Sequence, residues 1–417
     1  MSEYLVGLDI GTSNVRCAIA EYDADNDSIK FLGLGEAPST GLRSGVIVNI
    51  DATMRSVTAA IEKAEMMAGH EVTSLICGIG GSQVDSLNST GQIAVFSKDR
   101  RPREITQNDI ERVIEAARAV VIPMDRFIIH IIPRTYTVDK QGPVKDPINM
   151  LATRLDVDVN IITAVQSSAQ NFNKCIMRSG YEVQNLMSKT LAESVAVVTE
   201  EEQDLGSILI DLGGGSTDVI VFLNGAPIYS TSIPIGGITV TNDISIVRGI
   251  STDTAEEIKI KHGCCWDALV EDDETVLIPG VGGRPPEEIS RHEITAIIQP
   301  RIEEILNMVR QRINQQTKLT ELAGNVVLTG GGALMSGIIE IACDVFKTTA
   351  VRIGMPANFG DIKVNYRSPE YATVAGLIVA NCKKNKSLAN TKSSGSGRSG
   401  TKNSFWKSVG NFFKEFF

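Results

Sequence analysis

The sequence predicts an α/β protein of two domains of related design. Its 417 residues are too many for one compact core. One pattern also occurs twice: an apolar run ends in an aspartate, a turn of small residues follows, and an apolar run resumes. The first copy, VGLDIGTSNVRC, holds Asp9, and the second, SILIDLGGGSTDVIVF, holds Asp211, 202 residues later. A repeat of that length indicates two related domains rather than a solenoid.

Charge and composition narrow the function classes. The net charge of −10 argues against a general nucleic-acid binder. Residues 383–417 carry eight Lys/Arg and one acid, so the net charge of this stretch is +7. The net charge of the rest of the chain is therefore −17. A basic tail on an acidic body suggests that the tail meets an anionic surface. The seven scattered cysteines predict reduced thiols, the N-terminus lacks signal-peptide features, and no apolar run approaches the ~20 residues of a spanning helix.

The stretch between the two copies predicts a small β-α-β-β insert at residues 85–165. GQIAVF is typical of a strand, and Thr106–Asp109 has the spacing of a capping box. The segments FIIHIIPRTYTVD and DVDVNIITA predict two more strands. One face of the predicted helix carries its apolar residues, namely Ile110, Val113, Ile114 and Ala117.

The second half of the chain adds a third glycine-rich turn. In VVLTGGGALMSGIIE, Val326–Thr329 predicts a strand, Gly330–Gly332 a turn and Leu334 the start of a helix. Small-residue helices are predicted at 188–198 and 369–380. Gly376 lies inside the latter, where glycine costs about 1 kcal/mol against alanine, so we expect close backbone packing there.

The turns have a chemical rationale. A tip of small residues exposes backbone N–H groups, which donate hydrogen bonds to phosphate oxygens. The aspartate before each turn can hold the water shell of the Mg²⁺ that accompanies phosphate. Two such tips facing each other would hold a triphosphate and its metal from both sides, and the Gly330–Gly332 turn can take a phosphate or lie against the nucleoside. The sequence has no GxxxxGK[ST] phosphate loop.

The three turns, in this order, resemble those of the actin, sugar-kinase and heat-shock chaperone superfamily over residues 5 to about 380. The resemblance implies a two-domain actin-like ATPase fold that closes on ATP, with Asp9 and Asp211 holding Mg²⁺ through water. The AEEIK helix reaches the adenosine in bacterial actins, which implies roles for Glu257 and Lys259. The implied nucleotide contacts are Gly11, Thr12, Ser13, Asn14, Gly213, Gly214, Gly215, Ser216, Thr217, Gly237, Glu257, Lys259, Gly330, Gly331, Gly332 and Met335.

A narrower resemblance rests on HIIPRTYTVD, AEEIKIKHGC and VGGRPP, which are similar to the FtsA family of actin-like bacterial division proteins. It implies subdomain 1A with the insert 1C, subdomain 2A with the insert 2B, a flexible linker and a C-terminal amphipathic helix. The implied boundaries are 1–84 and 166–200 for 1A, 85–165 for 1C, 201–232 and 305–382 for 2A, 233–304 for 2B, 383–402 for the linker and 403–417 for the helix.

The last segment has the spacing of an interfacial helix. At 100° per residue its apolar side chains fall within about 140° of arc, and lysines flank them. One such tail binds a membrane reversibly, whereas several tails on one polymer bind firmly. The predicted membrane-facing residues are Phe405, Trp406, Val409, Phe412, Phe413, Phe416 and Phe417.

The resemblance implies an ATP-binding scaffold with weak or no ATPase activity. It would polymerise on the cytoplasmic face of the membrane at the division site and bind anionic lipids but no nucleic acid. It would tether FtsZ, by the FtsZ C-terminal peptide, through 233–304 and recruit later division proteins through 85–165. The alternatives are an actin-like adaptor of another assembly such as a pilus, a chaperone-like ATPase, and a sugar-kinase-type phosphotransferase. The last needs a general base, for which Asp211, Asp218 and Glu193 are candidates.

Overall fold

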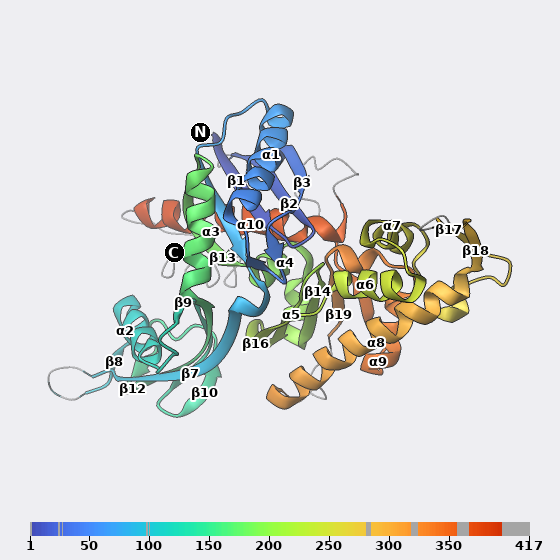
Figure 1. The fold of residues 1–417 in the computed structure, drawn as a ribbon. Helices are drawn as coiled ribbons and strands as arrows, with labels where there is room; N and C mark the ends of the chain where they lie inside the picture. Colours follow the sequence, from blue (N-terminus) through green and yellow to red (C-terminus); the bar gives the residue numbers. More distant parts are fainter. Residues whose placement is uncertain are drawn as a thin grey trace.

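The computed structural model describes residues 2–393 with short gaps. The gaps are residues 24, 25, 27, 97, 98, 100, 281–284, 318–323 and 357–366, and side chains are described up to residue 382. The chain forms two domains, each built on a five-stranded sheet and each carrying an insert (Figure 1). The predicted α/β class and two-domain organisation are confirmed.

The two large sheets share one topology, which confirms the predicted internal repeat. The first has the order β13-β6-β1-β2-β3, and the second has the order β20-β19-β14-β15-β16. In each sheet three consecutive strands pair antiparallel, and two later strands add in parallel. The first sheet comprises β1 (Ser2–Ile10), β2 (Asn14–Asp23), β3 (Ser28–Pro38), β6 (Ser74–Ile79) and β13 (Glu182–Ser188). The second comprises β14 (Ser207–Leu212), β15 (Thr217–Leu223), β16 (Ala226–Ile233), β19 (Val326–Thr329) and β20 (Val351–Ile353).

Helices cover both faces of the first sheet. Leu8 and Ile10 of β1 pack in one apolar cluster with α1 (Ile50–Ala68) and α3 (Gln166–Arg178). Leu5 lies on the opposite face and packs against α10 (Ala372–Ser393). Because successive side chains of a strand point to opposite faces, burial of both faces explains the nearly continuous apolar run at the start of the chain.

The helices α4 (Lys189–Val197) and α10 cross in close contact, as the sequence predicted for residues 188–198 and 369–380. A Cβ atom at Gly376 would lie 1.9 Å from the carbonyl oxygen of Ala192. That approach is impossible for any residue other than glycine. The predicted reason for a glycine inside this helix is therefore confirmed.

The first insert is a four-stranded antiparallel sheet with one helix packed on it. Its strand order is β10-β9-β12-β7, and the predicted β-α-β-β pattern is confirmed. Thr106 and Asp109 form the predicted capping box, and the four predicted apolar positions of the helix are buried. The elements are β7 (Val84–Ala94), β8 (Arg103–Glu104), α2 (Gln107–Arg118), β9 (Arg126–Val138), β10 (Gln141–Val144), β11 (Leu151–Ala152) and β12 (Arg154–Val165).

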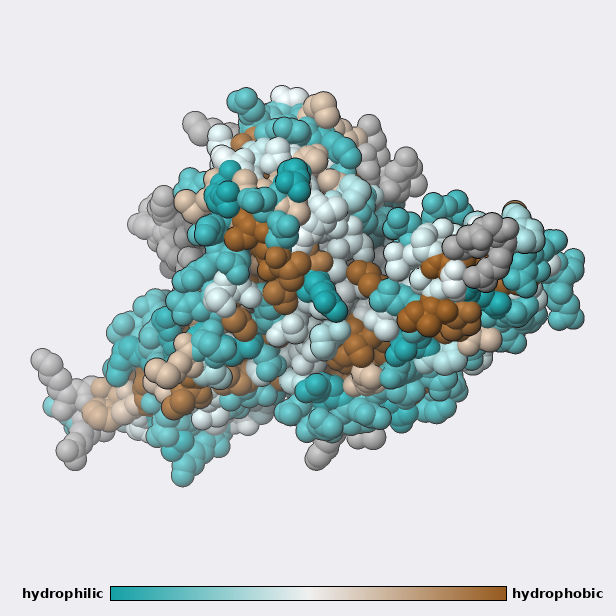
Figure 2. Space-filling view, viewed as in Figure 1, coloured by the Kyte–Doolittle hydropathy of each residue, from teal (hydrophilic) through white to brown (hydrophobic). Residues whose placement is uncertain are grey.

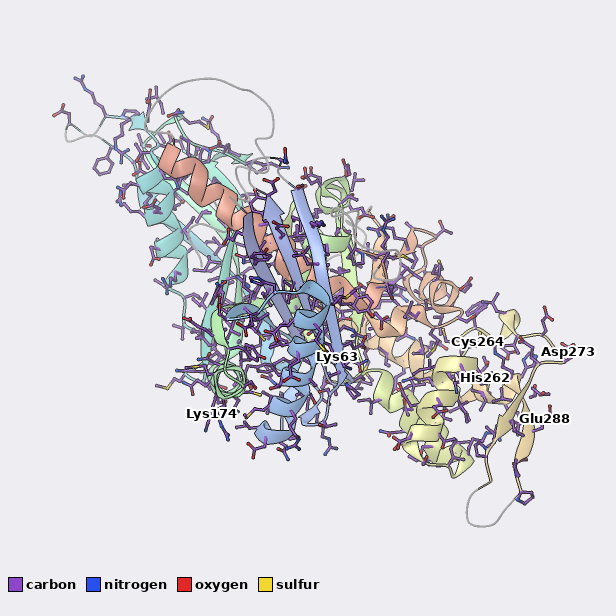
Figure 3. The ribbon with its side chains drawn as sticks, turned by 90° about the horizontal axis from the view of Figure 1, so that it is seen from above. Lys63, Lys174, His262, Cys264, Asp273 and Glu288 are labelled. Atoms are coloured by element: carbon purple, nitrogen blue, oxygen red, sulfur yellow. The ribbon has the colours of Figure 1, made fainter. Side chains whose placement is uncertain are left out.

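The second insert lies at the opposite end of the molecule (Figure 1). Its β17–β18 hairpin forms the outer end, where Figure 3 labels Asp273 and Glu288. Residues 281–284 of the VGGRPP turn lie outside the described residues. The predicted boundary at 304 falls inside one continuous helix, so it does not separate two structural units. The elements are α6 (Gly237–Arg248), α7 (Thr252–His262), β17 (Thr275–Ile278), β18 (Glu287–Ser290) and α8 (Arg291–Gln316).

The C-terminal region departs from the prediction in one respect. Helix α10 continues to Ser393, so the first residues of the linker predicted from Lys383 are helical. The amphipathic segment 403–417 lies outside the described residues. The part of the chain that the structure describes contains no helix both long and apolar enough to cross a membrane. All seven cysteines are free, in agreement with the predicted reduced thiols.

Candidate functional site

The first predicted phosphate loop is a tight hairpin between β1 and β2. The Gly11 N–H donates to the Asn14 carbonyl oxygen at 3.0 Å. A Cβ atom at Gly11 would lie 2.6 Å from that same oxygen, so the turn requires glycine. Asp9 lies at the base of the hairpin, paired in register with Arg16, and is buried.

The second predicted loop repeats this geometry between β14 and β15. The Gly213 N–H donates to the Ser216 carbonyl oxygen at 3.1 Å. Asp211 lies at the base of the hairpin and pairs in register with Asp218. The same local sequence pattern thus gives the same hairpin in both domains.

The tips of the two loops meet across the boundary between the domains. A Cβ atom at Gly214 would lie 2.1 Å from the Ser13 hydroxyl oxygen, and one at Gly215 would lie 2.5 Å from the Thr12 hydroxyl oxygen. A Cβ atom at Gly215 would also lie 2.9 Å from the backbone Cα of Ser44, so glycine is required there, and any side chain at Gly214 would displace the Ser13 hydroxyl. The facing arrangement expected from the sequence is present, and both aspartates border one shared site.

A buried lysine lies among the acids at the base of the loops. The Lys189 ammonium is 2.5 Å from Asp9 Oδ1 and donates to the Ile10 carbonyl oxygen at 3.0 Å. Burial alone would lower the pKa of Lys189, but the charges of Asp9, Asp218 and Asp211 raise it. Burial and the neighbouring charge of Asp218 raise the pKa of Asp211 to about 7.

Glu193 of α4 completes the acidic group. Its Oε1 accepts a hydrogen bond of 2.7 Å from the Thr373 hydroxyl, whereas its Oε2 accepts none from a described residue. Burial, together with the charge of Asp211, raises the pKa of Glu193 well above its ordinary value. Glu193 and Asp211 are thus neighbouring buried carboxyls whose charges oppose each other.

Asp218 connects the domains directly. Its Oδ2 accepts a hydrogen bond of 3.0 Å from the Gly81 N–H, which belongs to the first domain. Burial raises the pKa of this carboxyl, and its hydrogen bonds oppose the shift. Asp218 thus serves as a tie across the domain boundary, which the sequence did not predict.

The third glycine-rich turn lies against the second loop. Gly330 has a φ of 80°, and a Cβ atom there would lie 2.0 Å from Asp211 Oδ1. The turn continues as a short 3₁₀ helix over Gly331–Leu334. Helix α9 (Ile338–Phe346) begins four residues later than the predicted start at Leu334. The Met335 N–H closes the turn by donating to the Gly332 carbonyl oxygen at 3.2 Å.

The acids at this site fit a divalent cation that keeps its water shell. Carboxylate oxygens are the ligands that Mg²⁺ prefers, and Mg²⁺ usually retains several waters. Within the described ranges, no three acidic, histidine or cysteine side chains converge closely enough to ligate an ion directly. Asp9 and Asp211, at the bases of the facing loops, would be the residues that accept hydrogen bonds from such waters.

Family models match two stretches of the chain. The model "Cell division protein FtsA" matches residues 208–376, and the model "SHS2 domain inserted in FTSA" matches residues 81–163. The chain is 42% identical over 376 residues to the cell division protein FtsA of Borreliella burgdorferi, with 90% of each chain covered. It is 35% identical over 381 residues to FtsA of Escherichia coli K12, with 90% of this chain and 89% of the relative covered. The chain belongs to the FtsA family.

Solved structures share the fold at lower identity. The chain aligns with a protein of the PilM-PilN type IV pilus biogenesis complex at a TM-score of 0.66 and 16% identity, covering 91% of this chain and 98% of that one. It aligns with MreB5 of Spiroplasma citri bound to AMPPNP at a TM-score of 0.56 and 17% identity, covering 93% and 99%. These likenesses confirm the predicted actin-like fold, and the SHS2 match coincides with the predicted insert of the FtsA family.

The two residues expected to reach the adenosine do not lie together. Lys259 Nζ donates to the Gly237 carbonyl oxygen at 3.2 Å and pairs with Glu256 at 2.7 Å. Gly237 in turn donates its N–H to the Gly213 carbonyl oxygen at 2.9 Å, so Lys259 borders the second loop. Glu257 instead pairs with Lys261, and its side chain is 69% exposed.

Helical spacing explains which acid pairs with Lys259. Residues three apart lie on one helix face, whereas residues two apart do not. Glu256 and Lys259 are three apart, and Glu257 and Lys259 are two apart. Glu256 is therefore the acid that pairs with Lys259 beside the second loop, and the role of Glu257 at the adenosine stays a prediction.

Sequence reasoning also missed Lys189. A lysine at the first position of a helix meets the positive end of the helix dipole, which is unfavourable by about 0.3–1 kcal/mol. A lone lysine in that place, inside an otherwise small and apolar segment, was the available signal.

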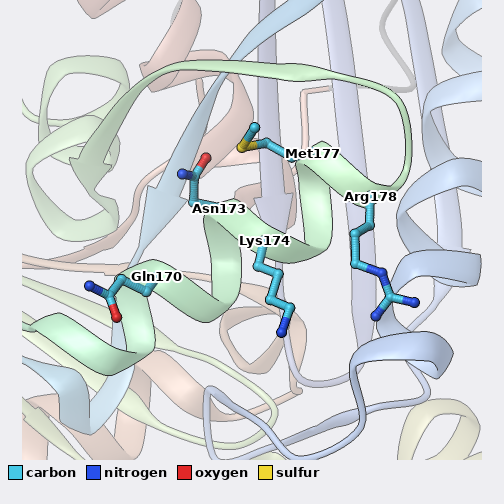
Figure 4. Close-up of a pocket in the computed structure, with 5 residues that line it drawn as sticks. All are labelled: Gln170, Asn173, Lys174, Met177 and Arg178. Carbon is cyan, nitrogen blue, oxygen red and sulfur yellow. The ribbon is translucent and has the colours of Figure 1, made fainter.

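A separate pocket lies on the outer side of α3, as Figure 4 shows. None of its lining residues belongs to the glycine-rich loops or to the acidic group. The pocket is therefore distinct from the candidate site. It is lined by Gln170, Asn173, Lys174, Met177 and Arg178.

Proposed function

We propose that the chain is an ATP-binding, actin-like scaffold of cell division. One observation supports this function best. The two hairpins, one from each domain, touch at their tips, and the aspartates at their bases share one buried cluster with Lys189. The tips carry backbone N–H groups for the phosphates, and Asp9 and Asp211 hold Mg²⁺ through water. The third turn and the Lys259 region border the nucleoside.

Calorimetric titration of the purified protein with ATP and Mg²⁺ tests this step. We expect one nucleotide per chain. A wild-type protein that binds no ATP in the presence of Mg²⁺ would contradict the proposal.

The second insert is proposed to bind the C-terminal peptide of FtsZ. Several large apolar side chains on α6 and α7 are exposed, among them Ile246 at 79%, Val247 at 62% and Ile260 at 73%. Figure 2 shows hydrophobic residues on this part of the surface. Exposed apolar side chains of this kind suit the docking of a short amphipathic segment. The first insert is proposed to recruit later division proteins.

Assembly and membrane attachment are proposed to act together on the cytoplasmic face of the membrane at the division site. The basic tail with its aromatic residues would bind anionic lipid weakly as a monomer and firmly as a polymer. Pelleting on anionic vesicles with and without ATP, followed by electron microscopy, tests the coupling. We expect ATP to increase both the bound fraction and the number of filaments. Filaments that form without any gain in lipid binding would argue against it.

Hydrolysis is proposed to be slow. Burial raises the pKa of Glu193 well above its ordinary value, which disfavours the ionised form that a general base needs. Asp211 and Asp218 remain candidates. A steady-state phosphate-release assay on wild type and on Glu193→Gln tests this assignment, and equal low rates are expected.

A further inference from the structure

Lys189 occupies a slot that the fold builds around its side chain. A Cβ atom at Gly78 would lie 3.1 Å from Lys189 Cγ, and one at Gly80 would lie 2.9 Å from Lys189 Cδ. The two glycines near the end of β6 therefore leave room for the methylene stem. The side chain is 13% exposed, so its path through the protein is fixed by packing.

The slot delivers the ammonium to the acidic group. The Lys189 ammonium lies 2.5 Å from Asp9 Oδ1, and the carboxylates of Asp211 and Asp218 are near enough to interact with it. The Ile10 carbonyl oxygen accepts a second bond at 3.0 Å and fixes its direction. A buried ammonium is tolerated only where paired acids and hydrogen bonds compensate for lost hydration.

The negative charges of the acidic group explain why a lysine lies among them. Buried carboxylates on Asp9, Asp211 and Asp218 repel one another, and a cation is needed to hold them together. Asp9 and Asp211 are also the residues proposed to hold the hydrated Mg²⁺. One internal cation and one external cation therefore compete for the same carboxylates.

We infer that Lys189 is a tethered counter-ion of the nucleotide site. It neutralises the carboxylates while no nucleotide is bound, and it thereby keeps free Mg²⁺ from binding to the protein alone. Mg²⁺ then enters together with the phosphates, whose negative charge restores the balance. Lys189 thus acts through the carboxylates that it holds in place, as a positioning residue. The inference rests on the proposed nucleotide site.

The test is titration of the nucleotide-free protein with Mg²⁺ alone, by calorimetry and by thermal melting in EDTA and in Mg²⁺. Lys189→Met keeps the stem and removes the charge. We expect this variant to bind Mg²⁺ at least tenfold more tightly than wild type. Its melting temperature should be lower than that of wild type in EDTA and should return to the wild-type value in Mg²⁺. Mg²⁺ affinity unchanged within twofold would overturn the inference.

Arg248→Met is the matched control, because the Arg248 side chain is 18% exposed and pairs with Glu293 at 3.0 Å outside the acidic group and the nucleotide site. We expect no gain in affinity for Mg²⁺ alone in this variant. An equal gain would show that loss of any buried positive charge suffices, which would also overturn the inference.

A second pair of variants covers the case in which Lys189→Met fails to fold. The single variant is Asp218→Asn, and the double variant adds Lys189→Met, so the two differ only by the lysine charge. The double variant removes one negative and one positive charge and therefore keeps the net charge of the wild-type acidic group. The double variant should bind free Mg²⁺ at least tenfold more tightly than the single one, and equal affinities would contradict the inference. ATP binding by wild type is measured separately, so failure of the nucleotide site and failure of the lysine role are distinguishable.

Discussion

The imidazole Nε2 of His130 accepts a hydrogen bond of 3.0 Å from the backbone N–H of Ser188. The bond joins β9 of the first insert to the residue that precedes Lys189. Because Nε2 must be unprotonated to accept, the bond selects the neutral imidazole. Burial lowers the pKa of His130 to about 3, which keeps the ring neutral in the folded protein at all ordinary pH values.

This pKa predicts a specific sensitivity to acid. Below pH 6.5 the unfolded chain gains a proton on His130, while the folded chain gains none until about pH 3, so stability falls as the pH falls through this window. His130→Gln, whose amide oxygen can accept the same bond, should lose about 2 kcal/mol less unfolding free energy than wild type between pH 7 and pH 5. Urea unfolding at both pH values measures the difference. Equal losses in the two proteins would argue that the buried imidazole takes up its proton in the same pH range as in the unfolded chain.

Gly214→Asp should abolish ATP binding. Its Cβ atom would lie 2.1 Å from the Ser13 hydroxyl oxygen, and its carboxylate would place negative charge where the phosphates bind. Calorimetry with ATP and Mg²⁺ should show at least a hundredfold loss of affinity. Circular dichroism should show that the variant remains folded. A variant that keeps wild-type affinity would rule out the facing-loop site.

Gly376→Ala should destabilise the protein although alanine favours helices. The added methyl would lie 1.9 Å from the Ala192 carbonyl oxygen, and overpacking of this kind costs about 1–3 kcal/mol. Gly331→Ala is the control, because nothing lies within 4 Å of a Cβ atom there. Thermal melting should lower the transition of the first variant and leave the second near wild type. An unchanged transition in Gly376→Ala would mean that α4 and α10 move apart at little cost in stability.

Ile246→Asp with Val247→Asp should weaken binding of the FtsZ C-terminal peptide at least tenfold. Both side chains are exposed on α6, so charge there should disturb docking without disturbing the core. Point changes are preferable to deletion of 233–304, because that deletion would cut through α8. Val121→Asp, 94% exposed in the first insert, should leave peptide affinity unchanged. Fluorescence anisotropy with a labelled peptide gives both values, and full affinity in the double variant would exclude α6 as the docking site.

Truncation after Lys402 should release the protein from anionic vesicles, because it removes all seven predicted membrane-facing residues. Co-sedimentation with and without vesicles measures the bound fraction. Neutral vesicles and high salt should weaken binding of the full chain in the same direction. If the truncated chain sediments with lipid as well as the full one, the anchor lies elsewhere.

Local patterns predicted what local geometry determines. A strand, a turn of small residues and a second strand are neighbours in the chain, so Asp9 and Asp211 could be placed at the bases of two hairpins from spacing alone. The same holds for the capping box of Thr106 and for Gly376, because a glycine inside a helix needs a packing reason.

Contacts between distant residues could not be predicted in this way. Lys189 meets Asp9 across 180 residues, and Asp218 meets Gly81 across 137, because the two domains close on each other. The short strands β8 and β11 were missed because each has two residues, too few for a periodic pattern. Helix α10 continues to Ser393, beyond the end of its apolar stretch, and a hydrophobic pattern cannot predict that extension.

Helix α8 has a mechanical consequence. Its 26 residues make a rod of about 39 Å that begins beside the β17–β18 hairpin and shares its buried side chains with the sheet of the second domain. Its buried side chains run from Ile294 to Ile313, so packing holds the rod along most of its length. A displacement of the hairpin is therefore transmitted through the helix to the sheet. Pro300, which lacks an N–H group, removes one hydrogen bond from the helix on this path.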